Sequence, residues 1–125
     1  MKLNTLMVIN SIIAFVFGIA FVLIPWQVLS LYGTQPSPEL NYVGQLFGGA
    51  LLTFAVLTWI ARNADKSDAR KAIVMALLIG DVIGFILSLI AQLNNVVNNF
   101  GWSTVVIYFL LAIGFAYFTF SNKQS

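Results

Sequence analysis

The sequence contains no cysteine and no histidine. A membrane thiol oxidoreductase needs a reactive cysteine pair, and a haem held between helices by two imidazoles needs histidine, so both classes are excluded. Transition metals lose their preferred ligands as well, because only four Asp and Glu residues remain and they are scattered along the chain. We therefore expect no metal site and no cofactor that is held by a coordinating side chain.

Charge is also scarce. Charged residues make up 8% of the 125 residues and hydrophobic residues 60%, a balance far outside that of soluble proteins. A helix needs about 20 apolar residues to cross the hydrocarbon layer of a bilayer, and four runs of the sequence reach that length. The sequence therefore predicts an all-α integral membrane protein, a single four-helix transmembrane bundle over residues 1–125, with spans at 6–24, 42–60, 72–91 and 102–120.

The cations lie outside the predicted spans, and if the four spans alternate, all of them fall on one side of the membrane. By the positive-inside rule that side is cytoplasmic. We therefore expect a multi-pass protein of the cell (inner) membrane with both termini in the cytoplasm. No basic stripe with interleaved aromatic residues indicates nucleic-acid binding. The six cations are Lys2, Arg62, Lys66, Arg70, Lys71 and Lys123.

Two connections contain clear signals for where helices begin and end. Pro25 ends the first span, and the segment from Trp26 to Tyr32 is expected to lie along the headgroup region as a short interfacial turn that Gly33 terminates. Ser37 before Pro38 and Ser67 before Asp68 are the residue types that cap a helix N-terminus.

Small residues recur within each span, which is the pattern that allows helices to approach closely in lipid. The first and second spans and the third and fourth spans are expected to form two similar hairpins within a compact bundle. The predicted helix-packing residues are Gly18, Gly44, Gly48, Gly49, Gly80, Gly84, Ala112 and Ala116.

Asp81 is the unusual residue, because it lies in the apolar run LLIGDVIGFILSLI. Its depth is roughly 13 Å from the cytoplasmic edge at 1.5 Å per residue, close to mid-membrane. A charged acid there costs about 2.5–3.5 kcal/mol, and no Lys or Arg lies within a span to neutralise it. We therefore expect an uncharged Asp81 that faces protein.

Counting residues from the membrane edges places other polar side chains near the depth of Asp81. Thr53 is expected level with it and Tyr108 one turn further out. A second polar layer is predicted outward of Asp81 at Gln45, Ser88 and Thr104, and an inner layer near the cytoplasmic side at Asn10, Thr58 and Tyr117. The candidate buried polar site comprises Asp81, Thr53, Tyr108, Gln45, Ser88 and Asn10.

Two interpretations of this site remain open. Asp81 either ties its helix to the neighbours by hydrogen bonds worth about 0.6 kcal/mol each, or it is a titrating or cation-binding group in a polar track from Asn10 through Thr53 to Gln45. The phenylalanines, among them Phe15, Phe17, Phe21, Phe109, Phe115, Phe118 and Phe120, are expected to contact lipid.

The layout of Pro25, Tyr32-Gly33, the segment QLFGGALL at residues 45–52 and the segment WIAR at residues 59–62 resembles small, uncharacterised four-span membrane proteins of the DoxX-like type. The resemblance implies the four-helix architecture and no particular activity. In similar sequences a basic residue often precedes the glycine pair, where this chain has Gln45.

No paired carboxylates, no nucleophile beside a base and no phosphate-binding loop are present, so we expect no enzymatic activity. The first functional expectation is an accessory or scaffolding subunit, which associates with itself as a homo-oligomer or with a larger membrane complex. The alternative is a small carrier or binder of a lipophilic or cationic molecule that uses Asp81. The two differ in what lies between the helices: a subunit fits a filled bundle, whereas a carrier requires a cavity that reaches Asp81.

Overall fold

The structure is a computed structural model that describes residues 1–121, and within that range it contains five α-helices and no strand. Four of the helices are long and apolar enough to cross a membrane, which confirms the all-α class and the four candidate spans. Each of the four begins before the apolar run that predicted it. The helices are α1 (Leu3–Leu23), α2 (Pro25–Leu31), α3 (Pro38–Ala61), α4 (Asp68–Leu93) and α5 (Gly101–Phe120).

The signals at the helix ends act as the sequence predicts. The hydroxyl of Ser37 accepts a hydrogen bond from the backbone N–H of Leu40 at 3.1 Å, and the hydroxyl of Ser67 accepts one from Arg70 at 3.1 Å. The predicted interfacial turn is the short helix α2. The helix ends at Leu31, and the turn that follows it contains Gly33, whose φ of +80° is readily adopted by glycine.

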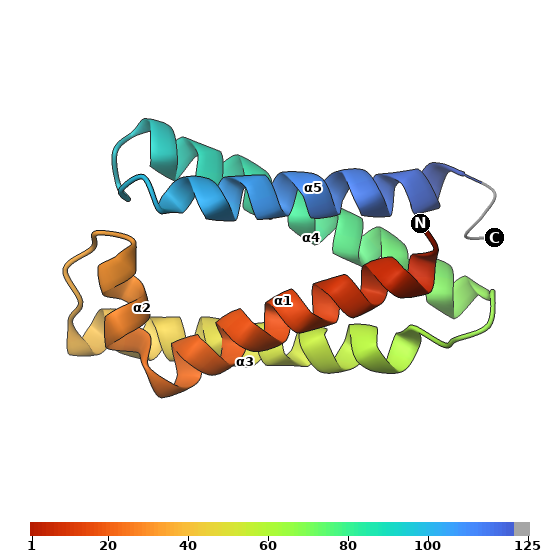
Figure 1. Cartoon of the computed structure of the whole chain (residues 1–125), viewed down its shortest axis with the longest axis horizontal. Coiled ribbons are helices and arrows are strands. Elements are labelled where there is room, and N and C mark those ends of the chain that lie inside the picture. Colours follow the sequence, from red (N-terminus) through yellow and green to blue (C-terminus); the bar gives the residue numbers. More distant parts are fainter. Residues whose placement is uncertain (122–125) are drawn as a thin grey trace.

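The long helices are arranged as two antiparallel pairs, α1 with α3 and α4 with α5 (Figure 1), which confirms the predicted hairpins. The first pair crosses closely at Gly18 and Gly48. A Cβ atom added to Gly48 would lie 2.8 Å from the Gly18 carbonyl oxygen, so only glycine allows this approach. The hydroxyl of Ser11 on α1 donates to the Ala55 carbonyl at 2.8 Å and adds a polar contact to the same interface.

The two pairs meet at the end of the molecule that holds the N-terminus. A continuous apolar core joins α1, α3, α4 and α5 there, and a Cβ atom on Gly114 of α5 would lie 2.9 Å from the Leu6 side chain of α1. This core consists of Leu3, Leu6, Met7, Ala61, Val74, Leu77, Leu111, Phe115 and Phe118.

At the opposite end, hydrogen bonds connect the two pairs. The hydroxyl groups of Tyr32 and Thr104 are 2.5 Å apart, and the backbone N–H of Asn98 donates to the Tyr32 carbonyl at 2.8 Å. The Asn98 side chain donates to the Leu31 carbonyl at 3.0 Å. Between these two ends the pairs separate around a cavity, so the helices do not pack along their whole length as a compact bundle would.

Two of the predicted helix-packing residues, Gly49 and Gly80, do not pack against another helix. A Cβ atom on Gly49 or on Gly80 would meet nothing within 4 Å, because Gly49 lies on the exposed side of α3 and Gly80 lines the cavity. A Cβ atom added to Gly44 would lie 3.5 Å from the Phe21 ring, an ordinary van der Waals contact, and Gly84 lies against the Tyr108 ring. Ala112 and Ala116 on α5 are half-buried.

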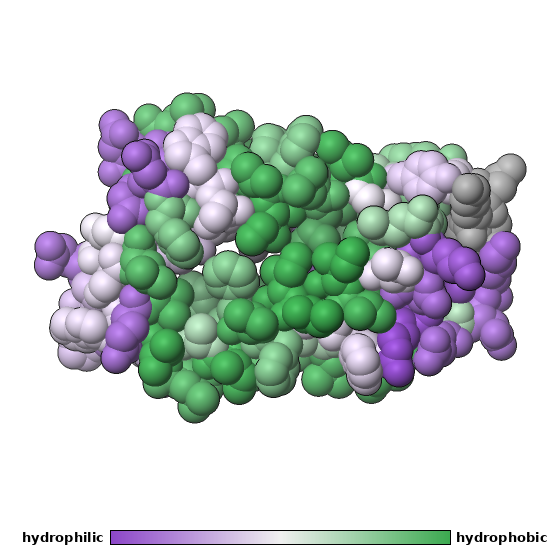
Figure 2. All heavy atoms as spheres, in the orientation of Figure 1, coloured by the Kyte–Doolittle hydropathy of each residue, from purple (hydrophilic) through white to green (hydrophobic). Residues whose placement is uncertain are grey.

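The surface consists of an apolar belt between two hydrophilic ends (Figure 2). We call the end with the N-terminus the basic end, because Lys2, Arg62, Lys66, Arg70 and Lys71 lie in the segments there, and the other end the α2 end. Lys123, the sixth cation of the sequence count, lies outside the described residues. The distribution of the described cations agrees with the predicted positive side, and the orientation in a membrane stays a prediction.

Candidate ligand cavity

A cavity of about 370 Å³ lies between the two helix pairs. One wall comes from α1 and α3, the other from α4 and α5, and α2 borders it at one end. Its lining is mainly apolar, with large side chains such as Phe17, Phe54, Leu77 and Leu111. Figure 2 shows a gap in the surface between the pairs on the face formed by α1 and α5, so the cavity opens sideways, within the apolar belt.

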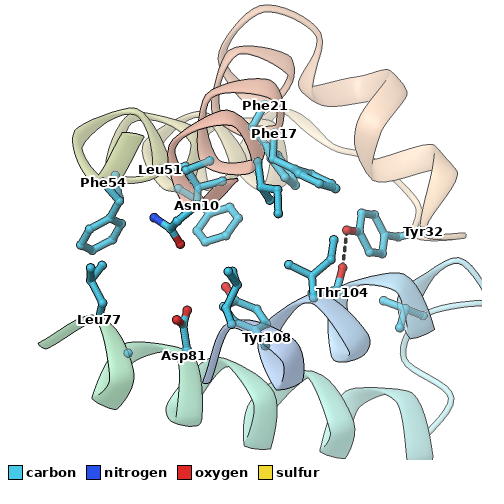
Figure 3. Close-up of a pocket in the computed structure, with 18 of the residues that line it drawn as sticks. Asn10, Phe17, Phe21, Tyr32, Leu51, Phe54, Leu77, Asp81, Thr104 and Tyr108 are labelled. Atoms are coloured by element: carbon cyan, nitrogen blue, oxygen red, sulfur yellow. Dashed lines mark hydrogen bonds between the residues drawn. The ribbon is translucent and has the colours of Figure 1, made fainter. Parts of the chain in front are cut away.

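Asp81 projects into this cavity from the midpoint of α4 (Figure 3). The residue is 9% exposed, and its Oδ2 atom is buried with no hydrogen-bond partner among the described residues. Within residues 1–121 it is the only acidic or basic side chain that lines the cavity. Asp81 is thus buried among the helices, as the sequence predicts, but the polar partners expected for it are not found.

Two other polar side chains of the lining, Asn10 and Thr104, already have hydrogen-bond partners. Asn10 points into the cavity from the opposite wall, and its Nδ2 atom donates to the Thr58 hydroxyl at 3.4 Å. Thr104 is bonded to the Tyr32 hydroxyl at 2.5 Å. Burial raises the pKa of Tyr32, and the hydrogen bond to Thr104 acts in the opposite direction with a smaller effect. The Tyr32 hydroxyl therefore remains protonated throughout the physiological pH range.

Tyr108 also lines the cavity, next to Asp81 along the wall formed by α4 and α5. Its ring fills the space in front of Gly84, where an added Cβ atom would clash with the ring carbon Cε1. Gly84 thus has a packing role, as predicted, and that role is to seat the Tyr108 ring beside the cavity.

Three residues of the predicted polar site lie elsewhere. Thr53 is exposed and its hydroxyl donates to the Gly49 carbonyl of its own helix at 3.1 Å. Gln45 is exposed and donates to the Val22 carbonyl at 3.1 Å, and the hydroxyl of Ser88 donates to the Phe85 carbonyl at 3.1 Å. None of the three lines the cavity, so the predicted track from Asn10 through Thr53 to Gln45 does not exist.

The reason is the rotation of α3. Gly48 must face α1 for the close crossing, and Thr53 is about 140° away from Gly48 around a helix with 3.6 residues per turn. Depth alone puts Thr53 level with Asp81, but the glycine contact turns it outward. The predicted inner layer forms in part: Asn10 and Thr58 are bonded to each other, whereas Tyr117 is exposed.

The phenylalanines divide into three groups, and the expectation that they contact lipid stays a prediction for the exposed group. Phe17 and Phe21 line the cavity, and Phe115 and Phe118 belong to the core at the basic end. The exposed members are Phe15, Phe109 and Phe120.

Sequence reasoning misses the contributions of Tyr32 and Asn98 to the site. The sequence places Tyr32 at the interface only, yet its hydroxyl and its carbonyl both bind the other helix pair. Asn98 is one of four asparagines in the connection between α4 and α5, and its side chain also accepts a hydrogen bond from the backbone N–H of Phe100 at 3.0 Å, which fixes the loop. A signal for these contacts is the Tyr-Gly turn itself, because the turn after α2 places a polar aromatic residue where it can reach the other helix pair.

Among residues 1–121, no group of three or more Asp, Glu, His or Cys residues is arranged to hold a metal ion. The site therefore offers a single carboxyl group, the Tyr108 hydroxyl beside it, amide and hydroxyl groups that are already hydrogen-bonded, and mainly apolar walls. This arrangement suits non-covalent binding of a small molecule through a polar contact at Asp81.

Comparison with known proteins gives one family and nothing more specific. No curated protein and no solved structure matches the sequence. A family described as a domain of unknown function, DUF8292, matches residues 1–121, which include both helix pairs and the whole cavity. The match has no bearing on the DoxX-like resemblance, which stays a prediction. The chain belongs to the DUF8292 family.

Proposed function

We propose that the protein binds a lipophilic amine in the cavity between its helix pairs, with Asp81 as the polar contact. The observation that supports this most strongly is the buried Asp81 oxygen, which lacks a partner among the described residues in an otherwise apolar cavity. A buried acceptor without a partner costs about 1–3 kcal/mol, so a ligand that donates a hydrogen bond to it gains that amount on binding.

The composition of the lining favours a cationic head group on the ligand. In the described part of the chain, no Lys or Arg lines the cavity opposite Asp81, so the lining supplies no counter-charge for an ionised carboxylate. An ammonium group provides both the charge and the N–H donors. The volume of about 370 Å³ lies within the range of small-molecule sites, and the apolar walls suit an alkyl or aromatic body.

The position of the opening favours a ligand that arrives from the bilayer. The gap between the pairs lies in the apolar belt, whereas the core closes the basic end and hydrogen bonds close the α2 end. A molecule that partitions into lipid would reach Asp81 without crossing water. The accessory or scaffolding role, the first expectation from the sequence, needs no such cavity and is the weaker candidate.

The test is binding of n-octylamine to the purified protein in lipid nanodiscs, with empty nanodiscs as the background. Octanoate, which has a similar chain and an anionic head group, is the matched probe. We expect octylamine to bind and octanoate not to bind, and Asp81→Asn to weaken octylamine binding about 10- to 100-fold, because a hydrogen bond to a charged group contributes about 1.5–3 kcal/mol. Equal affinity of the Asn variant, or no octylamine binding to the wild type, would overturn the proposal.

A pair of glycine variants tests whether the cavity is the site. Gly80→Phe puts a ring into the cavity, whereas Gly49→Phe puts the same ring on the outer side of α3, and neither Cβ atom would meet an atom within 4 Å. Octylamine binding is expected to disappear in the first variant and to persist in the second. Binding that survives Gly80→Phe would place the amine elsewhere.

We also propose that the protein lies in the inner membrane with its basic end on the cytoplasmic side, on the basis of the cation distribution. Since the chain has no cysteine, Lys66→Cys and Asn99→Cys each create a single thiol. A membrane-impermeant maleimide added to the outside of cells should label Asn99→Cys and not Lys66→Cys. The reverse pattern would overturn this orientation.

A further inference from the structure

A second pocket, of about 400 Å³, lies at the basic end, away from Asp81. Three cations from different segments line it: Lys2 before α1, Arg62 after α3 and Arg70 in the first turn of α4. Within the described chain the lining of this pocket contains no acidic side chain, although Asp65 lies in the connection between α3 and α4 and Asp68 is the first residue of α4. Cations that are distant in the sequence are therefore gathered around one space.

The two arginines are held in place by contacts to the protein. The Nη1 atom of Arg70 donates to the Ala64 carbonyl at 2.8 Å, and the Arg62 guanidinium donates to the Trp59 carbonyl. The Arg62 guanidinium also stacks on the Trp59 ring, with its carbon 3.8 Å from the ring centroid. Fixed guanidinium groups lose less conformational entropy when they bind an anion than mobile lysines do.

The rest of the pocket suits an anion that is joined to an apolar body. Asn4 and Asn63 add amide groups at its rim, while the buried side chains of Leu3 and Phe118 form apolar parts of its lining. Guanidinium and ammonium groups arranged around one space are the groups that bind phosphate in proteins. The basic end is also where helices that cross a membrane reach the lipid headgroups.

We propose that this pocket binds a phosphate group, and that Lys2, Arg62 and Arg70 contact it. Two sources supply that chemistry, the headgroup of an anionic phospholipid and free phosphate. The proposal is independent of amine binding at Asp81, because none of residues 1–121 lines both pockets.

The experiment uses the purified full chain in a neutral maltoside detergent, and native mass spectrometry counts the molecules that remain bound. The probes are phosphatidylglycerol, diacylglycerol with the same acyl chains but no phosphate, and inorganic phosphate. We expect phosphatidylglycerol to be retained and diacylglycerol to be lost. If inorganic phosphate displaces phosphatidylglycerol, the site takes free phosphate as well; if it does not, the site requires the lipid. Equal retention of both lipids would overturn the proposal.

Matched double variants separate a built pocket from general surface charge. Arg62→Gln with Arg70→Gln removes two cations that line the pocket, and Lys66→Gln with Lys71→Gln removes two exposed cations that do not. The first pair should weaken phosphatidylglycerol retention about 30-fold, at about 1 kcal/mol for each of the two cations, and the second should change it much less. Equal loss in both would show that only surface charge attracts the lipid.

Thermal unfolding in the same detergent reports whether the arginine variant is folded. If that variant is unfolded, the comparison is made between Lys2→Gln and Lys66→Gln, because both side chains are exposed and only Lys2 lines the pocket. Weaker lipid retention in Lys2→Gln alone supports the phosphate site, and no difference between the two overturns it.

Discussion

At the scale of the residue, Asp81 lowers the stability of the fold that contains it. Its Oδ2 atom is buried without a partner among the described residues, whereas the buried Asn10 and Ser11 both form hydrogen bonds across α1 and α3. A carboxyl group that held the helices together would be expected to form such bonds. The structure therefore favours a role in binding over the structural role that the sequence leaves open.

The difference between a binding role and a structural role for Asp81 gives a prediction for Asp81→Leu. Leucine has a similar size and removes the unpaired acceptor, so the variant should raise the free energy of unfolding by about 1–3 kcal/mol while octylamine binding is lost. Thermal unfolding in detergent measures the first effect and the nanodisc assay the second.

The matched control for Asp81→Leu is Thr58→Val, at a fully buried residue whose hydroxyl donates to the Phe54 carbonyl at 2.8 Å. Replacing it leaves the Asn10 amide without its acceptor, so this variant should be destabilised by about 1 kcal/mol. If Asp81→Leu is destabilised to the same extent, then Asp81 supports the fold and the structural interpretation is correct.

The residues of the site could be predicted only in part. The position of Asp81 in an apolar run is enough to predict that it is buried and faces protein. Residue counting gives the depth of a side chain but not its rotation about the helix axis. For that reason the prediction that Thr53 and Gln45 belong to the polar site is wrong. The rotation of α3 is determined by its contact with α1 at Gly48, which requires knowledge of both helices.

At the scale of the element, the caps, the break at Pro25 and the pairing of consecutive spans can be read from the sequence, because each depends on a few adjacent residues. The glycines are harder to assign. Gly48 and Gly49 are neighbours in α3, and the sequence treats them alike. The structure places the first against the backbone of α1 and the second in open space.

Alanine substitutions at these two glycines should therefore have opposite effects. A methyl group on Gly48 would lie 2.8 Å from both the Gly18 carbonyl oxygen and the Phe21 Cβ atom, so Gly48→Ala should force the helices apart and lower stability by about 1–3 kcal/mol. Gly49→Ala should raise the free energy of unfolding by up to about 1 kcal/mol, because alanine has the higher helix propensity and its methyl group would meet no other atom. The thermal midpoints of the two variants in the same detergent provide the measurement. A loss of equal size in both would contradict the close crossing at Gly48.

At the scale of the whole molecule, the two helix pairs are joined by different forces at the two ends. Apolar packing that involves all four long helices joins them at the basic end, whereas a few hydrogen bonds around Tyr32 and Asn98 join them at the α2 end. The sequence does not indicate this, because its small residues suggest contact along the full length of each span. The cavity begins where the apolar core stops, at Leu77, about a third of the way along α4, and at Leu111, about halfway along α5.

This asymmetry predicts that the pairs separate first at the α2 end. Tyr32→Phe removes the hydrogen bond to Thr104 but keeps the ring, which packs edge-on against Phe100 with centroids 4.9 Å apart. Loss of one hydrogen bond of about 1 kcal/mol should raise the population of separated states about fivefold. Spin labels on Gln27→Cys and Asn99→Cys measure the distance at the α2 end by double electron–electron resonance, and a second pair on Thr5→Cys and Phe120→Cys measures it at the basic end.

In Tyr32→Phe the distance distribution should broaden for the labels at the α2 end and remain unchanged for the labels at the basic end. Octylamine should narrow the distribution at the α2 end again, because it fills the cavity between the two helix pairs. Tyr42→Phe, at an exposed residue of α3, is the matched variant and should change neither distribution. Broadening at both ends would mean that the core does not hold the basic end together. No broadening at either end would mean that the Tyr32 hydroxyl does not hold the two pairs together at the α2 end.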